Sequence, residues 1–140
     1  MRKYISIIAA FIGYYISYFF GGWSLALETL CVMIAIDYIT GLCVAGIFRN
    51  SPKTVNGALE SRAGFKGIIR KCVIFLCVLI GASLDRLLET NYLRDGICYG
   101  YIVNELISIL ENFGLMGVKY PAIITKALEI LQSKGDGTND

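Results

Sequence analysis

The sequence contains no histidine, and charged residues make up only 17% of its 140 residues. The lack of histidine removes the commonest metal ligand and the usual general base. P-loops, GxGxxG loops and nucleophile elbows are also missing. The net charge of +2 is too small to indicate nucleic-acid binding. We therefore expect a protein that is not an enzyme, that holds no metal or other cofactor, and that has no nucleic-acid partner.

The five cysteines form no recognisable metal-binding or disulfide pattern. Their number is odd, no two have CxxC spacing, and each lies in or beside an apolar run. Cysteine in such surroundings behaves as a small hydrophobic residue. We expect neither a disulfide framework nor a zinc site at Cys31, Cys43, Cys72, Cys77 and Cys98.

Hydrophobic residues account for 56% of the sequence, which is more than a soluble domain of this length can bury. The surplus apolar surface must face lipid or other subunits. Long apolar runs of this kind are typical of membrane-spanning helices. We predict an all-α fold, namely a small polytopic membrane protein with three or four transmembrane helices and a short C-terminal helix.

Four apolar segments and one short helix can be placed along the chain. Crossing a bilayer takes about 20 mainly apolar residues, and a glycine pair at 21–22 offers a turn between the first two segments. This pair makes a poor signal-peptidase site, so we expect the first segment to be retained. We expect one transmembrane domain over 1–132 and a disordered polar tail over 133–140. Within the domain we place segments at 4–20, 23–48, 68–88 and 95–113, and the short helix at 121–132.

The connection 49–71 carries six basic residues against Glu60 alone, which gives it a net charge of +5. Positive charge concentrates on cytoplasmic loops. We therefore predict a cytoplasmic basic loop whose long side chains reach the membrane surface. These side chains belong to Arg62, Lys66, Arg70 and Lys71. Four crossings of the bacterial cytoplasmic membrane, with both termini in the cytoplasm, fit every loop. In a three-crossing alternative, the first or the fourth segment lies in the membrane interface.

Asp37 lies near the middle of the second segment, where a carboxylate costs roughly 2.5–3.5 kcal/mol on insertion scales. A residue in such a place is usually paired, protonated or in contact with water. Small residues follow it at four-residue spacing, which lets a neighbouring helix approach closely. This face is therefore either a helix-packing surface or the lining of a water-filled path. It consists of Asp37, Thr40, Gly41 and Ala45.

The segment 95–113 is amphipathic. At 100° per residue, its polar side chains fall within an arc of about 120°. A helix that lies on an anionic membrane surface carries Lys or Arg on its polar face, but this face carries two Glu instead. We therefore predict a polar stripe that faces the bundle interior or a pore. The stripe consists of Asn104, Glu105, Ser108, Glu111 and Asn112.

Three blocks, in this order between about residues 25 and 131, resemble the phage-lysis and toxin-secretion holins of Gram-positive bacteria and their phages. They are Asp37-Tyr38-Ile39-Thr40-Gly41, Ser61-x-x-Gly64-x-Lys66-Gly67-Ile68-x-Arg70-Lys71, and Asn104-Glu105-x-x-Ser108-Ile109-Leu110-Glu111-Asn112. The resemblance implies a protein that accumulates in membrane lipid and then forms a homo-oligomer. The oligomer would open lesions through which an endolysin reaches the cell wall or a toxin leaves the cell. The family usually has about three crossings, whereas the long apolar N-terminus of this chain leaves room for a fourth.

A small multi-helix transporter and a channel subunit are the alternative functions. Short helices and a membrane carboxylate are also found in small multidrug exporters. Those exporters depend on a carboxylate in their first helix, and the segment 4–20 has none. The residues therefore favour the holin hypothesis over a transporter.

Overall fold

The computed structural model describes residues 1–136, and this part of the chain contains five α-helices and no strand. The prediction of an all-α fold is therefore confirmed. The helices are α1 (Arg2–Phe19), α2 (Leu25–Gly46), α3 (Ser61–Leu88), α4 (Leu93–Leu115) and α5 (Ala122–Asp136). The four apolar segments and the short helix predicted from the sequence correspond to these five elements in order.

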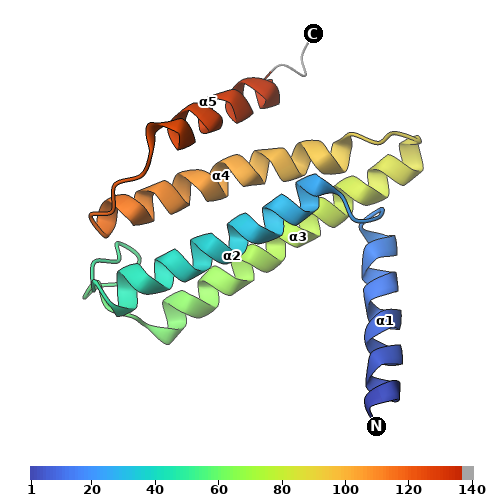
Figure 1. Ribbon diagram of the computed structural model, residues 1–140, viewed down its shortest axis with the longest axis horizontal. Coiled ribbons are helices and arrows are strands. Elements are labelled where there is room, and N and C mark those ends of the chain that lie inside the picture. Colours follow the sequence, from blue (N-terminus) through green and yellow to red (C-terminus); the bar gives the residue numbers. More distant parts are fainter. Residues whose placement is uncertain (137–140) are drawn as a thin grey trace.

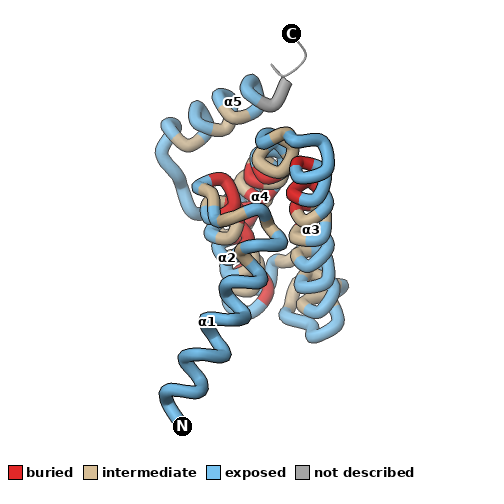
Figure 2. Tube along the Cα trace, turned by 90° about the vertical axis from the view of Figure 1, so that its right-hand side faces the viewer, coloured by how far each residue is buried: buried red, intermediate tan, exposed pale blue. Residues whose placement is uncertain are grey.

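Helices α2, α3 and α4 lie side by side, each antiparallel to the next along the chain (Figure 1). α4 packs against both α2 and α3, whereas α2 and α3 barely touch each other. The buried residues of the three helices face one another in the middle of the bundle (Figure 2). The core is built from Leu27 and Leu30 of α2, Val78 of α3, and Cys98 and Ile102 of α4. α4 is therefore the central helix on which the bundle depends.

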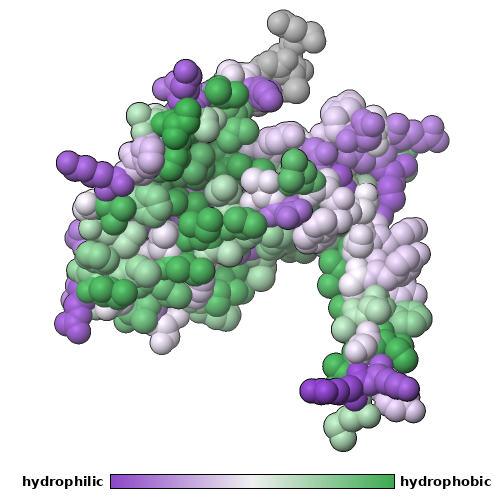
Figure 3. Space-filling model, viewed as in Figure 1, coloured by the Kyte–Doolittle hydropathy of each residue, from purple (hydrophilic) through white to green (hydrophobic). Residues whose placement is uncertain are grey.

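The outer surface of the bundle is largely apolar. Apolar residues cover much of its visible face and part of α1 (Figure 3). Large side chains such as Leu76 and Ile80 on α3 point outward and are more than half exposed, at 57% and 58%. A surface of this kind suits contact with lipid, since apolar patches this extensive are rare on soluble monomers.

The first and last helices lie outside the bundle. α1 points away from it and runs across the direction of the other helices, so that almost all of its residues are exposed (Figures 1 and 2). α5 packs along α4. Neither helix contributes a residue to the buried core cluster, although Leu131 of α5 packs against its edge.

Two helices, α2 and α3, are long and apolar enough to cross a bilayer, which is fewer than the three or four expected. The other two apolar segments fall short because of their charges. α1 begins with Arg2 and Lys3, and α4 contains Arg94, Asp95, Glu105 and Glu111.

The second half of the predicted basic loop is helical. α3 begins at Ser61 rather than at residue 68, so Arg62, Lys66, Arg70 and Lys71 lie on a helix and not in a loop. Their long unbranched side chains are good helix formers, and three of them recur every four residues along the helix. The loop between α2 and α3 is therefore shorter than predicted.

The predicted disordered tail is also partly helical. α5 continues to Asp136, so residues 133–136 extend the short helix by another turn. The rest of the predicted tail, residues 137–140, lies outside the described residues.

Candidate functional site

An ion triad joins the three bundle helices. Lys71 of α3 extends its ammonium group between α2 and α4, and its Nζ lies 2.6 Å from Asp37 Oδ2. The same Nζ donates a hydrogen bond to Glu105 Oε2 on α4. Asp37 and Glu105 are each only 5% exposed. One cation from α3 is therefore held by two buried carboxylates from its two neighbouring helices.

Asn112 ties α4 to α2 beside this triad. Its Nδ2 donates to Thr40 Oγ1 at 2.9 Å and to Asp37 Oδ1 at 3.3 Å. The hydroxyl of Thr40 in turn donates to the backbone carbonyl of Asp37 at 3.0 Å. Gly41 lies beside this contact, and a Cβ at that position would make an ordinary van der Waals contact with Asn112 Nδ2, at 3.9 Å. The side-chain amide of Asn112 on α4 thus packs against small and polar residues of α2.

The triad carries a net charge of −1, since two carboxylates share one ammonium group. Opposite charges attract strongly where water is scarce, so Lys71 pulls both carboxylates toward the bundle centre. Removal of three charges from water is nevertheless costly, and the second carboxylate has no cation of its own. The triad therefore joins the helices, and its three groups have a formal charge of −1 when both carboxylates are ionised.

The sequence-predicted stripe residues separate into two groups. Asp37, Ala45, Glu105 and Asn112 are buried between helices, and Thr40, Gly41 and Ser108 are half-buried beside them. Asn104 and Glu111 are exposed. The last two still face the same space, because both line the cavity described below.

The partner of the two carboxylates was missed in the sequence. Lys71 was expected to reach the membrane surface, but its side chain is only 17% exposed and lies inside the bundle. The sequence did contain one signal for this role. Lys71 is the last charged residue before the uncharged run 72–84, so it lies nearer the middle of the membrane segment than the exposed cations of α3 do. Its rotation toward α2 and α4 could not be read from that position alone.

A cavity of about 760 Å³ extends from the triad to the loop between α2 and α3. Asp37, Lys71 and Glu105 line its inner part, and Lys53 and Thr54 of the loop line its outer part. Both polar and apolar side chains line it. The triad is therefore next to a space large enough for several water molecules or for part of a ligand.

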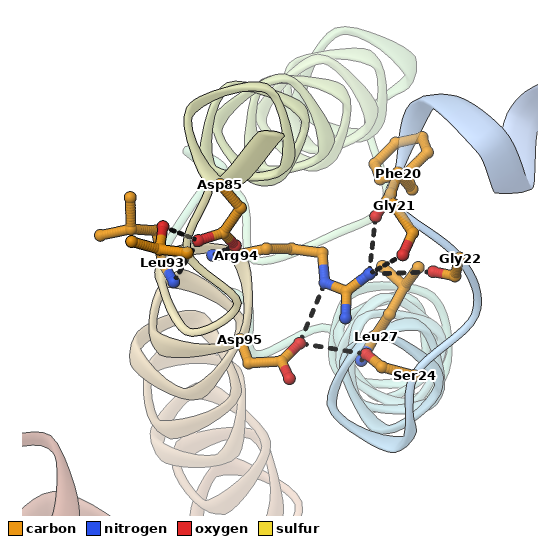
Figure 4. A network of polar contacts seen from close by, with 10 residues as sticks. Phe20, Gly21, Gly22, Ser24, Leu27, Asp85, Leu93, Arg94 and Asp95 are labelled. Atoms are coloured by element: carbon orange, nitrogen blue, oxygen red, sulfur yellow. Dashed lines mark hydrogen bonds and ion pairs between the residues drawn. The ribbon is translucent and has the colours of Figure 1, made fainter. Parts of the chain in front are cut away.

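A second polar cluster closes the opposite end of the bundle (Figure 4). Asp85, near the end of α3, accepts hydrogen bonds from the backbone N–H groups of Leu93 and Arg94, at 3.0 and 2.9 Å. The hydroxyl of Thr90 donates to the same carboxylate at 2.6 Å. Asp85 therefore satisfies the free N–H groups at the start of α4 and fixes the turn between the two helices.

Arg94 links this turn to the turn between α1 and α2. Its Nη1 donates to three backbone carbonyls, those of Phe20, Gly21 and Gly22, at 2.7, 3.0 and 3.0 Å (Figure 4). Gly21 and Gly22 have φ angles of +75° and +89°, which other residues adopt only with strain. This cluster was not predicted from the sequence. The available signal was the pair of opposite charges, Arg94 and Asp95, in the first turn of α4.

No group of three or more metal-ligating side chains occurs in the part of the chain that the structure describes. The five cysteines are free, and Cys98 is buried in the core whereas Cys72 is exposed. The polar sites of this fold are therefore ion pairs and hydrogen bonds between helices.

Comparison with known proteins gives a consistent result. The sequence pattern of the bacteriophage holin family matches residues 14–133. An uncharacterised protein of Listeria monocytogenes is 40% identical over 84% of this chain and 79% of its own length. An uncharacterised 14.9 kDa protein of Clostridium perfringens is 38% identical over 88% of this chain and 89% of its own. A probable holin of Bacillus phage phi105 is 35% identical over 79% of this chain and 76% of its own. No solved structure matches the chain.

Proposed function

Because this chain belongs to the bacteriophage holin family, we propose that it assembles with copies of itself in the bacterial cytoplasmic membrane and opens lesions there. Such lesions would give a cytoplasmic endolysin access to the cell wall, or would release a toxin. The observation that carries this proposal is the contrast between the two sides of the bundle. Its outside is apolar, whereas its inside holds two carboxylates, an ammonium group and an amide.

The polar interior supports a change from a closed monomer to an open oligomer. In the closed bundle, Glu105 and Asn112 on the polar face of α4 are buried against α2 and α3, whereas Asn104 and Glu111 of the same face are exposed and line the cavity. If α4 separates from α2 and α3, Glu105 loses its ion pair with Lys71 and Asn112 loses its hydrogen bonds to α2. Both side chains must then be solvated by water or must pair with the polar face of α4 from another copy of the protein. A ring of such helices would place these side chains around an aqueous opening. Burial of a second carboxylate beside Asp37 costs free energy in the closed bundle, and this cost lowers the free energy needed to open it.

We further propose that α2, α3 and α4 cross the membrane and that α1 lies along its surface. α4 can cross despite its charges because Glu105 and Asn112 are buried in the bundle and the charges of Arg94 and Asp95 lie at one end. α1 runs across the bundle direction (Figure 1), so it lies in the membrane plane when the bundle crosses. With the basic start of α3 in the cytoplasm, the C-terminus is also cytoplasmic and α1 is on the outer surface. This arrangement corresponds to the three-crossing alternative.

Terminal tags test this topology. We expect protease added to intact spheroplasts to remove an N-terminal epitope tag and to leave a C-terminal tag protected. A cytoplasmic marker protein should remain uncleaved in the same samples. Protection of both tags would contradict the proposal and would indicate four crossings.

Inducible production in bacteria tests the function itself. We expect abrupt lysis when the chain is produced together with a cytoplasmic endolysin that has no export signal. The chain or the endolysin alone should not cause abrupt lysis. A small transporter or an ion-selective channel subunit cannot release a folded enzyme, so the absence of lysis in the combined culture would support one of those alternatives.

Neutral variants of the two triad carboxylates test the role of the extra charge. Asp37→Asn or Glu105→Gln removes the net charge, and an unbalanced membrane carboxylate costs on the order of 2.5–3.5 kcal/mol. We expect each variant to stabilise the closed bundle and to delay lysis in the same two-component assay. Glu111→Gln is the matched control, because Glu111 is an exposed glutamate on the same helix and belongs to no ion pair among residues 1–134. Unchanged timing in both triad variants, or an equal delay in the control, would refute this role.

A further inference from the structure

Three cations line the outer part of the 760 Å³ cavity without a carboxylate partner. Lys53 comes from the loop, and Lys66 and Arg70 come from α3. Lys66 and Arg70 are four residues apart, so their side chains lie one above the other on the same face of the helix. Among residues 1–134, the ion pairs are Lys71–Asp37, Lys71–Glu105 and Arg94–Asp95, and none of them involves these three cations.

The cations of the cavity that form no ion pair favour an anion. Lys71 is already engaged by Asp37 and Glu105 at the inner end. The other acidic residues that line the cavity are Glu60 and Glu111, two negative charges against the three unpaired cations. Over the whole lining, four cations face four carboxylates, so the site rests on the placement of Lys66 and Arg70, two cations without an ion-pair partner one turn apart on α3.

Apolar walls adjoin these cations. Leu42, Leu59 and Val73 line the same cavity. A second hollow of about 420 Å³ shares Leu42 and Leu59 with it and continues between α2 and α3 past Phe65 and Ile68. The hollow exists because α2 and α3 barely touch along their length. A small inorganic anion makes no favourable contact with apolar walls. An amphiphile can place its anionic head against the cations and its apolar chain against the walls.

The length of α3 places these cations near the level of the lipid phosphates. A helix of 28 residues is about 42 Å long, whereas the hydrocarbon core of a bilayer is about 30 Å thick. About 12 Å of α3 therefore extends beyond the hydrocarbon, shared between its basic start and its end at Asp85 and Arg86. Lys66 and Arg70 lie near the level at which the start of α3 enters the hydrocarbon, from where their long side chains can reach the headgroups.

We propose that this cavity binds the headgroup of an anionic phospholipid. The lipid phosphate lies between Lys66 and Arg70, with Lys53 above it, and an acyl chain runs along the groove between α2 and α3. Basic pockets between membrane helices are known to bind the headgroups of anionic lipids. The site rests on the proposed crossing of α3, but it adds a ligand that the opening mechanism does not require. The bound lipid would fill the gap between α2 and α3.

Lipid retention by the purified full-length chain tests this site. The chain is purified in a mild non-ionic detergent with added phosphatidylglycerol or phosphatidylcholine, and retained lipids are counted by native mass spectrometry. We expect one phosphatidylglycerol to remain bound preferentially over phosphatidylcholine. The double variant K66Q/R70Q should bind phosphatidylglycerol at least about tenfold more weakly, since each basic residue near such a lipid contributes about 1 kcal/mol.

The variant R49Q/R62Q is the matched control. It removes two basic residues from the same end of the molecule, and neither of them lines the cavity. We expect it to retain phosphatidylglycerol as the unmodified chain does. Equal loss in both double variants would overturn the site, because binding would then follow total charge. Displacement of the lipid by an excess of inorganic phosphate would also overturn it in favour of a simple anion site.

Carbonate extraction of membranes separates this proposal from the proposed function. If the chain stays in the membrane and causes lysis with an endolysin but shows no preference for phosphatidylglycerol, the lipid site alone is wrong. If the chain is extracted as a peripheral protein, the crossing of α3 is wrong, and the lipid site is overturned with it.

Discussion

Lys71→Met should destabilise the bundle by about 3–5 kcal/mol, the largest effect we expect from a single substitution in this protein. Methionine has a similar shape, but it leaves Asp37 and Glu105 buried beside each other without their shared cation. Removing one partner of a buried ion pair typically costs this much, because the remaining charge loses its only compensation. Thermal unfolding of the purified chain in a mild detergent measures the loss.

Two further variants separate the triad from a general effect of charge. Arg62→Met removes an exposed cation from the same helix and should leave the unfolding temperature nearly unchanged. The triple variant K71M/D37N/E105Q removes all three charges and should regain much of the lost stability, since neutral replacements of buried ion clusters are often tolerated. If Lys71→Met unfolds at the same temperature as Arg62→Met, the triad does not stabilise the bundle.

Gly81→Val should disrupt the packing of α3 against α4. Gly81 is buried, and a Cβ there would lie 3.0 Å from Arg94 Cα and 2.7 Å from Ile97 Cδ1. The side chain of Ile97 can turn away, but the backbone of α4 at Arg94 cannot move without losing its contacts. Overpacking of this kind costs about 1–3 kcal/mol. We expect a corresponding fall in the unfolding temperature in the same detergent.

Gly96→Val is the matched control for this substitution. It places the same branched side chain in a neighbouring helix, at an exposed position where a Cβ would meet no atom within 4 Å. It should therefore unfold close to the temperature of the unmodified chain. An equal fall in both variants would mean that valine weakens either helix by itself, and that the close approach at Gly81 is unimportant.

The helices could be predicted from the sequence because apolar runs of this length have few other structures available. α3 begins seven residues before its predicted start at residue 68, although its basic residues and Gly64 favour a loop. In fact Arg62, Lys66 and Arg70 recur every four residues, and one exposed helix face accommodates all three. Charge alone was therefore a poor guide to where that helix begins.

The composition of the candidate site was only half predictable. Asp37 and Glu105 were identified because a carboxylate in an apolar segment is costly wherever it lies. Their shared partner, Lys71, is 34 residues from each of them in the sequence. Its role depends on the rotation of α3 about its own axis and on how far α3 is shifted along α2 and α4. These are properties of the packed bundle, and no local pattern specifies them.

The shared ammonium group of Lys71 also sets an order of events during protein synthesis. Asp37 leaves the ribosome first and remains without a cation until Lys71 follows 34 residues later. A nascent hairpin of α2 and α3 is then electrically neutral at this level of the membrane. Glu105 arrives last and adds the second carboxylate. α4 is thus the last helix of the bundle to be made, and it adds both the final core residues and the second carboxylate of the triad. Until α4 arrives, α2 and α3 barely touch each other, so the same helix completes both the packing of the bundle and the triad.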